Sequence, residues 1–218
     1  MTRGALLVDA GGILFNNVTE ESGFLPELAE RYGADADRLR AELDLRDAAY
    51  ETNARSVFDV LRDALTAAGA PRSPDLDRER ITALYLAGVR AHRPVFDALE
   101  RLRAEHPGLV LALANNEAEA WDRAKNAEFG HFGYFDVLAS SWKLRAVKPT
   151  SVYLERLLDA CGCSRAQAVF VDDNPDVVSA VRDFGLAAVH LTDPARFATA
   201  VPAALRALAG PETGAGAG

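Results

Sequence analysis

Acidic, amide and basic side chains follow the apolar runs of this sequence at four places. The four groups are Asp9, Ala114-Asn115-Asn116, Lys148-Pro149 and Asp172-Asp173-Asn174. Open parallel sheets bind ligands at the carboxyl ends of their strands, so we expect these groups to converge on one site. Carboxylates hold a hard cation such as Mg²⁺, which bridges to substrate phosphate, while lysine neutralises the phosphate and an attacking carboxylate. These residue types predict phosphoryl transfer involving a small molecule.

The elements that must position these groups alternate between strands and helices. Continuous apolar runs, typical of strands buried on both faces, lie at 5–8, 109–113, 137–139, 168–171 and 187–191. Apolar residues at helical spacing lie at 94–104, 118–125, 151–160 and 175–184. Asn174-Pro175 is typical of a helix start. This order predicts an α/β fold with a Rossmann-like, doubly wound parallel sheet.

Residues 17–92 interrupt this order with successive helical patterns and no convincing strand. Apolar stripes for a small bundle are formed by Leu25, Leu28 and Tyr32, by Val57, Leu61 and Leu65, and by Ile81, Leu84, Tyr85 and Val89. We therefore expect 17–92 to be a helical cap, inserted into a discontinuous α/β core of 1–16 and 93–209. The end of the chain, 210–218, is rich in Gly and is expected to be disordered.

The composition limits the classes of partner and compartment. The chain has 218 residues, 49% of them hydrophobic, and its 24 Lys and Arg against 32 Asp and Glu give a net charge of −8. This balance argues against nucleic acid and favours a small-molecule substrate. No run resembles a signal peptide or a membrane span, so we expect a cytoplasmic protein without a membrane partner. Cys161 and Cys163 are expected to be structural thiols, and the sequence does not indicate an oligomeric state.

The motifs resemble, in order and over residues 5–191, those of the haloacid dehalogenase (HAD) superfamily, in its subfamily with an α-helical cap. That superfamily carries Asp-x-Asp-Gly-Thr/Val-Leu after a buried strand, where this chain has Asp9-Ala10-Gly11-Gly12-Ile13-Leu14. The resemblance implies a hydrolase in which Asp9 is the nucleophile of an aspartyl intermediate and Lys148 is its electrostatic partner.

The resemblance also implies a metal site and a substrate site. The Mg²⁺ ligands would be Asp9, the backbone carbonyl of Gly11, Asp172 and Asp173. The substrate would be bound by Asn115, Asn116 and Lys148.

Two positions depart from the pattern of the superfamily. Gly11 replaces the second Asp, which acts as general acid and base, and it leaves a backbone carbonyl for the metal but no carboxylate for proton transfer. Ala114 replaces the Ser or Thr whose hydroxyl would bind the transferring group. General acid and base catalysis contributes about 10²–10⁴ in rate. The sequence therefore predicts a hydrolase with an atypical site.

Several alternatives remain for a site without the second carboxylate. A dehalogenase-like or other ester-forming hydrolase is disfavoured by the acidic pair Asp172-Asp173, and a phosphonate-cleaving enzyme by the position of Lys125, Lys143 and Lys148 outside the cap. A substrate such as an acyl phosphate would need no acid. A catalytically impaired binding or regulatory protein would show affinity without turnover.

A substitute acid from the cap would be the remaining solution. The candidates near Gly11 are Asn16, Asn17, Glu20 and Glu21. The cap arginines Arg46 and Arg55 are expected at the surface, and His131 is expected to be a packed or loop histidine.

Overall fold

The computed structural model describes residues 4–71 and 74–209, so the predicted disordered end 210–218 lies outside the described residues. Its centre is a five-stranded parallel sheet in the order β3-β2-β1-β4-β5. The strands are β1 (Ala5–Val8), β2 (Val110–Leu113), β3 (Val137–Leu138), β4 (Ala168–Asp172) and β5 (Ala187–His190). Each overlaps a predicted strand, and the α/β fold with a parallel sheet is confirmed.

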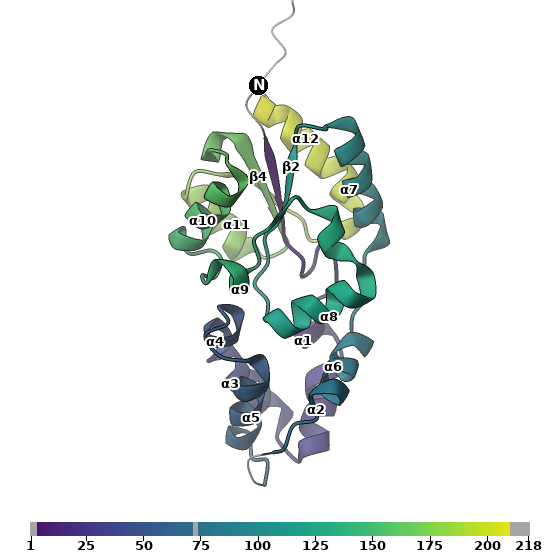
Figure 1. Cartoon of the computed structure of the whole chain (residues 1–218), viewed down its shortest axis with the longest axis vertical. Coiled ribbons are helices and arrows are strands. Elements are labelled where there is room, and N and C mark those ends of the chain that lie inside the picture. The colour runs from purple at the N-terminus through teal and green to yellow at the C-terminus, as the bar shows by residue number, and fades with distance from the viewer. Residues whose placement is uncertain (1–3, 72–73, 210–218) are drawn as a thin grey trace, which may run out of the picture.

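Helices cover both faces of the sheet. The helices that follow the inserted segment are α7 (Arg93–Glu105), α8 (Glu119–Phe129), α9 (Ser141–Leu144), α10 (Ser151–Cys161), α11 (Pro175–Asp183) and α12 (Phe197–Ala209). Leu6 and Val8 of β1 belong to the core with α7 and α12, whereas Ala5 and Leu7 belong to the core with α10 and α11. Figure 1 shows these two pairs of helices on opposite sides of the sheet. The doubly wound arrangement is therefore confirmed.

The two edge strands and the helices α9 and α12 of the α/β unit differ from the sequence prediction. β5 is not buried on both faces, because it is an edge strand at which Ala187 and His190 are exposed, and both residues of the other edge strand, β3, are half-buried. The short helix α9 was not predicted. α12 was not predicted, and it contains Pro202, a residue that removes a backbone donor and argues against a helix interior. Phe197 and Val201 of α12 are 0% exposed, so its packing against the sheet compensates for the proline.

Helices also fill the segment between β1 and α7. In its described part they are α1 (Val18–Glu21), α2 (Phe24–Tyr32), α3 (Ala36–Asp44), α4 (Asp47–Glu51), α5 (Val57–Ala67) and α6 (Arg78–Ala87). They gather at the lower end of Figure 1, away from the strands. We propose the division into a cap of 17–92 and a core of 1–16 and 93–209 on this basis. No described helix is long and apolar enough to cross a membrane.

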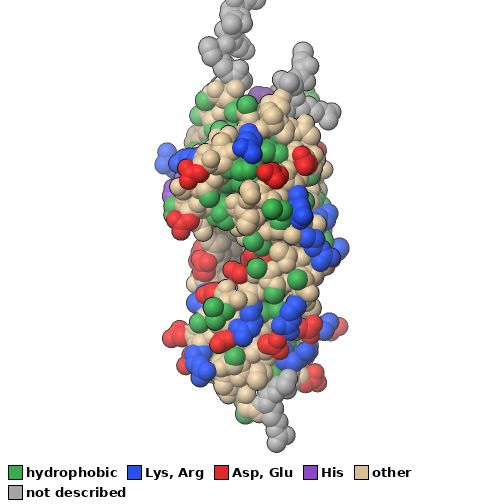
Figure 2. All heavy atoms as spheres, turned by 90° about the vertical axis from the view of Figure 1, so that its left-hand side faces the viewer, with side chains coloured by type: hydrophobic (Ala, Val, Ile, Leu, Met, Phe, Trp, Pro, Cys, Tyr) green, Lys and Arg blue, Asp and Glu red, His purple; other side chains and the backbone are tan. Residues whose placement is uncertain are grey.

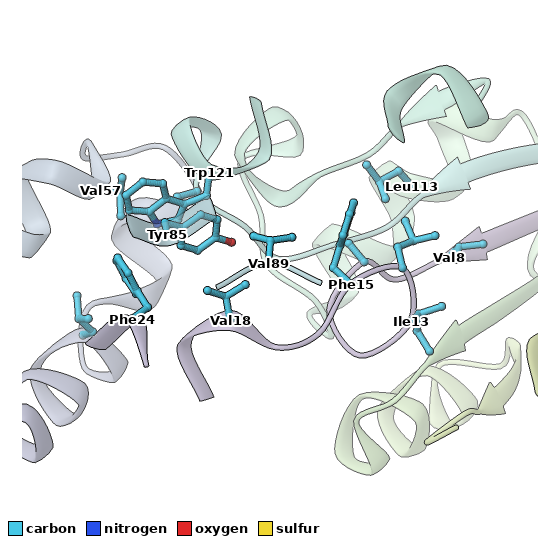
Figure 3. Close-up of a cluster of buried hydrophobic side chains, with 14 of the residues drawn as sticks. Val8, Ile13, Phe15, Val18, Phe24, Val57, Tyr85, Val89, Leu113 and Trp121 are labelled. Atoms are coloured by element: carbon cyan, nitrogen blue, oxygen red, sulfur yellow. The ribbon is translucent and has the colours of Figure 1, made fainter. Parts of the chain in front are cut away.

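The two connections to the inserted helices run side by side. Asn16 Nδ2 donates to the carbonyl of Gly88 at 3.1 Å, and Asn16 Oδ1 accepts from the backbone N–H of Arg90 at 2.6 Å. Figure 3 shows the apolar cluster continuing past these connections, with Phe15 on the sheet side and Tyr85 stacked on Trp121 on the other, at a centroid distance of 4.5 Å. This continuous packing fixes how the inserted helices lie over the strand ends.

Candidate active site

The side chains of Asp9, Lys148 and Asp172 meet at the carboxyl ends of β1 and β4. Lys148 Nζ lies 2.6 Å from Asp9 Oδ1 and 2.7 Å from Asp172 Oδ2. The three residues are 6%, 8% and 1% exposed, respectively. The parallel register explains why Asp9 and Asp172 lie close together. Val8 pairs with Val171, and the next residue along each strand is the aspartate. One ammonium thus bridges two buried carboxylates.

Hydrogen bonds that involve the backbone position these three residues. Asn116 Oδ1 accepts from Lys148 N at 2.9 Å, and Asn116 Nδ2 donates to Lys148 O at 3.0 Å. The N–H of Ala10 donates to Asp9 Oδ1 at 2.7 Å, and the N–H of Asn174 donates to Asp172 Oδ1 at 2.9 Å. Asn116, a predicted substrate ligand, therefore also positions Lys148.

The charges of this group are set by burial and by mutual attraction. Burial raises the pKa of Asp9, against the opposing effect of Lys148. Burial alone would lower the pKa of Lys148, but Asp9 and Asp172 raise it above its ordinary value. Lys148 is consequently a firmly protonated cation that can neutralise an anion at Asp9.

Asp173 adds a third carboxylate to the group. Asp9, Asp172 and Asp173 each offer an oxygen, and these oxygens lie within 4.8 Å of one another. Gly12 makes room for Asp173, since its φ is 65° and a Cβ there would lie 2.0 Å from Asp173 Oδ2. Three carboxylates against the single Lys148 ammonium suit a hard divalent cation. The donor set therefore fits the Mg²⁺ that the sequence predicts.

A cavity of about 200 Å³ opens beside this group, between the strand ends and the inserted helices. Its lining is mostly polar and aromatic, and comprises Ala10, Gly11, Asn16, Asn17, Val18, Thr19, Glu20, Tyr50, Glu51, Tyr85, Asn115, Asn116, Glu117, Trp121 and Lys125. The buried Oδ1 of Asn115 has no partner among the described residues. Asn115 therefore has hydrogen-bonding capacity that the described side chains do not use.

Comparison with protein families identifies the molecule. The family model for the haloacid dehalogenase-like hydrolases matches residues 4–185. The chain belongs to this family. The resemblance seen in the motifs is thereby confirmed, and with it the assignment of the chain to a family of hydrolases. No curated protein matches the chain.

Solved structures of HAD proteins share the fold. A HAD family enzyme from Bacteroides thetaiotaomicron, in complex with magnesium and inorganic phosphate, is 18% identical with a TM-score of 0.70, over 86% of this chain and 93% of that one. The L-2-haloacid dehalogenase of Xanthobacter autotrophicus, with covalently bound chloropropionic acid, is 19% identical with a TM-score of 0.59, over 86% and 76%. At these identities the likeness extends to the fold alone.

The space beside Gly11 is filled by Asn17 in this HAD chain. A Cβ on Gly11 would lie 2.4 Å from Asn17 Oδ1. The amide of Asn17 also donates to Asp173 Oδ2, with a distance of 3.1 Å between Nδ2 and Oδ2. Asn17 thus occupies the place where the second carboxylate of the motif would begin, but an amide cannot deliver a proton to a leaving group.

The second departure from the family pattern, Ala114, has a different setting. Ala114 is 0% exposed, belongs to the apolar core with α10, and is absent from the cavity lining. Its neighbour Asn115 is 1% exposed and lines the cavity, and Asn115 Nδ2 lies 3.4 Å from Asp122 Oδ1. Asn115, rather than Ala114, therefore lines the cavity at this strand end.

The four residues considered as substitute acids near Gly11 have separate surroundings. Asn16 binds the backbone of the second connection, and Asn17 binds Asp173. Glu20 reaches the cavity lining but is exposed in the first turn of α1. Glu21 is exposed and lies 3.6 Å from Arg90. None of the four is a buried carboxylic acid.

The remaining candidates lie away from the cavity lining. His131 is 0% exposed, and its Nε2 lies 3.2 Å from Asp122 Oδ1, as expected for a packed histidine. Arg46 and Arg55 pair with acidic side chains of the inserted segment. Cys161 and Cys163 are free thiols, as expected.

Sequence reasoning missed the aromatic and acidic residues that complete the cavity wall. Tyr85 Oη donates to Glu117 Oε2 at 3.1 Å, and Lys125 Nζ donates to the same oxygen at 2.6 Å. Tyr50 and Glu51 come from α4, which has only five residues and no apolar stripe that would place it. In the sequence Tyr85 belongs to an apolar stripe of the cap, and no spacing pattern connects Tyr50, Glu51 or Glu117 to Asp9.

Proposed function

We propose that the protein is a Mg²⁺-dependent phosphatase of a small phosphorylated metabolite, with Asp9 as the nucleophile. The observation that carries this proposal is the Lys148 ammonium, 2.6 Å from Asp9 and 2.7 Å from Asp172. A fixed cation at this position stabilises the negative charge that builds up when a carboxylate attacks a phosphoryl group. Asn115 lies at the cavity wall, where it would bind the substrate.

The proposed metal ligands are Asp9, Asp172, Asp173 and the backbone carbonyl of Gly11. Their grouping within 4.8 Å, given for the three carboxylates, supports this assignment. Bound Mg²⁺ would neutralise charge on the phosphoryl oxygens. The magnesium and phosphate in the Bacteroides thetaiotaomicron enzyme are consistent with the same use here.

A phosphate substrate is favoured over a haloacid by the three clustered carboxylates. A dehalogenase-like reaction needs no metal, because halide leaves as an anion, and gains nothing from Asp173 beside Asp172. A binding protein derived from an enzyme would need the cavity but not a lysine aimed at Asp9. The arrangement of Lys148 therefore favours turnover over binding alone.

The test is a panel of phosphate esters, acyl phosphates and 2-haloacids, assayed with Mg²⁺ and with a chelator. We expect phosphate release that requires Mg²⁺ and is lost in Asp9→Asn, which keeps the shape of the side chain but not its nucleophilicity. The proposal would be overturned if neither the native protein nor Asp9→Asn released phosphate from any phosphate substrate. Haloacid turnover that survives the chelator would replace it with the dehalogenase-like function.

A further inference from the structure

Glu51, the last residue of α4, lines the cavity. Glu51 and Gly11 line the same cavity of about 200 Å³, although they lie on different parts of the chain. The backbone carbonyl of Glu51 accepts a hydrogen bond from Ser141 Oγ of α9 at 2.7 Å. Glu51 is thus fixed in the wall of the cavity by a contact between the inserted helices and the α/β core.

The residues after Glu51 strengthen this contact. Asn53 Nδ2 donates to Glu119 Oε2 at 2.7 Å, and the guanidinium of Arg145 donates to the carbonyl of Asn53 at 2.9 Å. Residues 51–53, named the docking segment, are therefore held against α8 and α9 by side-chain hydrogen bonds. No hydrogen bond or ion pair to the Glu51 carboxyl occurs within 4–71 and 74–209, which leaves the group free to meet a substrate.

The surroundings of Glu51 favour its neutral form at neutral pH. Burial raises the pKa of Glu51 to about 8, and Asp47, Glu117 and Asp9 add to the rise against the lowering effect of Lys148. The other titratable side chains of the cavity wall are Glu20, Tyr50, Tyr85 and Lys125. Lys125 is bonded to Glu117, so its charge is largely committed to that partner.

We propose that Glu51 is the general acid and base of this active site, supplied by α4 in place of the carboxylate that Gly11 lacks. The inference rests on the proposed phosphatase function and names the proton donor within it. It also sets the substrate class, since an acid at this position is useful for alkyl phosphate monoesters, whose alkoxide leaving group needs a proton. Acyl and aryl phosphates leave as stabilised anions and have less need of it.

Glu51 and water supply every proton that the proposed reaction transfers. A carboxylate oxygen of Asp9 attacks phosphorus, the ester P–O bond breaks, and the leaving oxygen takes the proton of Glu51 to give an alcohol. Water then attacks the phosphorus of the aspartyl phosphate, and the Glu51 carboxylate accepts a proton from that water. Phosphate leaves, and the Asp9 carboxylate and the Glu51 carboxylic acid are restored.

The experiment compares Glu51→Gln with native protein on an alkyl phosphate and on 4-nitrophenyl phosphate, both with saturating Mg²⁺. We expect kcat/KM for the alkyl ester to fall by about 10²–10⁴, the usual contribution of general acid catalysis, and kcat/KM for the aryl ester to stay close to the native value. Glu51→Asp, which keeps an acid, should recover part of the loss. The native profile for the alkyl ester should decline as pH rises through about 8, and Glu51→Gln should lack this decline.

A matched control is Glu79→Gln, which removes an exposed carboxylate from α6 of the same inserted segment and should change neither rate. Equal loss on both esters, or none on the alkyl ester, would overturn the assignment of Glu51 while leaving the phosphatase intact. A different result would show that the proposed phosphatase function is wrong: native protein and Asp9→Asn would then be equally inactive on both esters.

Discussion

Restoring the missing carboxylate by Gly11→Asp should require the simultaneous removal of the Asn17 side chain. A Cβ on residue 11 would lie 2.4 Å from Asn17 Oδ1, well inside van der Waals contact. Gly11 does not share the positive φ of Gly12, so the backbone itself accepts a side chain there. The obstacle is therefore the amide of Asn17, which must leave its hydrogen bond to Asp173 to make room.

The size of this effect follows from that hydrogen bond. A hydrogen bond to a charged group contributes about 1.5–3 kcal/mol, so Gly11→Asp alone should lower the free energy of unfolding by about that amount. For a chain of this length each kcal/mol corresponds to about 2–4 °C in Tm. Asn17 precedes α1 without a side-chain capping bond, so Asn17→Ala loses the same contact but no cap. The double variant should be no less stable than Gly11→Asp alone.

The assay is alkyl phosphatase activity in the Glu51→Gln background, with thermal unfolding measured on the same samples. Gly11→Asp with Asn17→Ala should raise kcat/KM by about 10²-fold or more, because an acid returns to the place where the HAD pattern has one. Gly11→Asp alone should gain less. Gly11→Asn with Asn17→Ala is the matched control, since it has the same shape but no proton to give.

Two results would refute this reasoning. If Gly11→Asp alone is as stable as the native protein and as active as the double variant, Asn17 does not occupy the space beside residue 11. If the Gly11→Asn control recovers activity as well as the aspartate does, the gain comes from packing and not from proton transfer.

Three further variants test the charges, the metal site and the docking segment. The pKa of Glu51 is raised from 4.5 to about 8, so the folded protein binds more protons than the unfolded chain between these values, and stability declines as pH rises through them. Glu51→Gln should therefore raise the free energy of unfolding by about 1–3 kcal/mol at pH 8 and by little at pH 4, measured by denaturant titration; equal effects at both pH values would contradict this. Gly12→Ala should weaken the activating affinity for Mg²⁺ by about 10–100-fold through displacement of Asp173, with native circular dichroism, and an unchanged Mg²⁺ titration would exclude the contact. Ser141→Ala should lower the free energy of unfolding by about 1–3 kcal/mol and reduce alkyl ester turnover more than aryl ester turnover; equal turnover losses would argue against positioning of Glu51.

The sheet was predictable because its central strands are buried on both faces and therefore read as uninterrupted apolar runs. Val8 and Val171 end two such runs at the same level, so the convergence of Asp9 and Asp172 followed from the parallel order alone. Edge strands and a helix with an internal proline carry weaker signals. β5 was for that reason expected to be more buried than it is, and α12 was missed.

The proton donor was not predictable by the same reasoning. Asn17 is close to Gly11 in sequence, but the atom that fills the space beside Gly11 depends on a backbone turn that the sequence does not specify. Glu51 lies at the end of a helix of five residues, and its high pKa arises from neighbours on other elements, including Glu117 and Asp9. Residue type and spacing predict the chemistry of side chains that belong to one motif. A side chain supplied from the opposite wall of the cavity can be identified only in the folded structure.

With Glu51 as the proton donor, the docking segment would couple the size of the substrate to catalysis. The hydrogen bonds of residues 51–53 to α8 and α9 hold Glu51 in the wall of a cavity of about 200 Å³. An oversized metabolite would hold α4 away from Ser141, and with it the proton that its own cleavage requires. Such a molecule would bind to the site without being hydrolysed. The protein would therefore discriminate among phosphate esters by the rate of hydrolysis as well as by affinity.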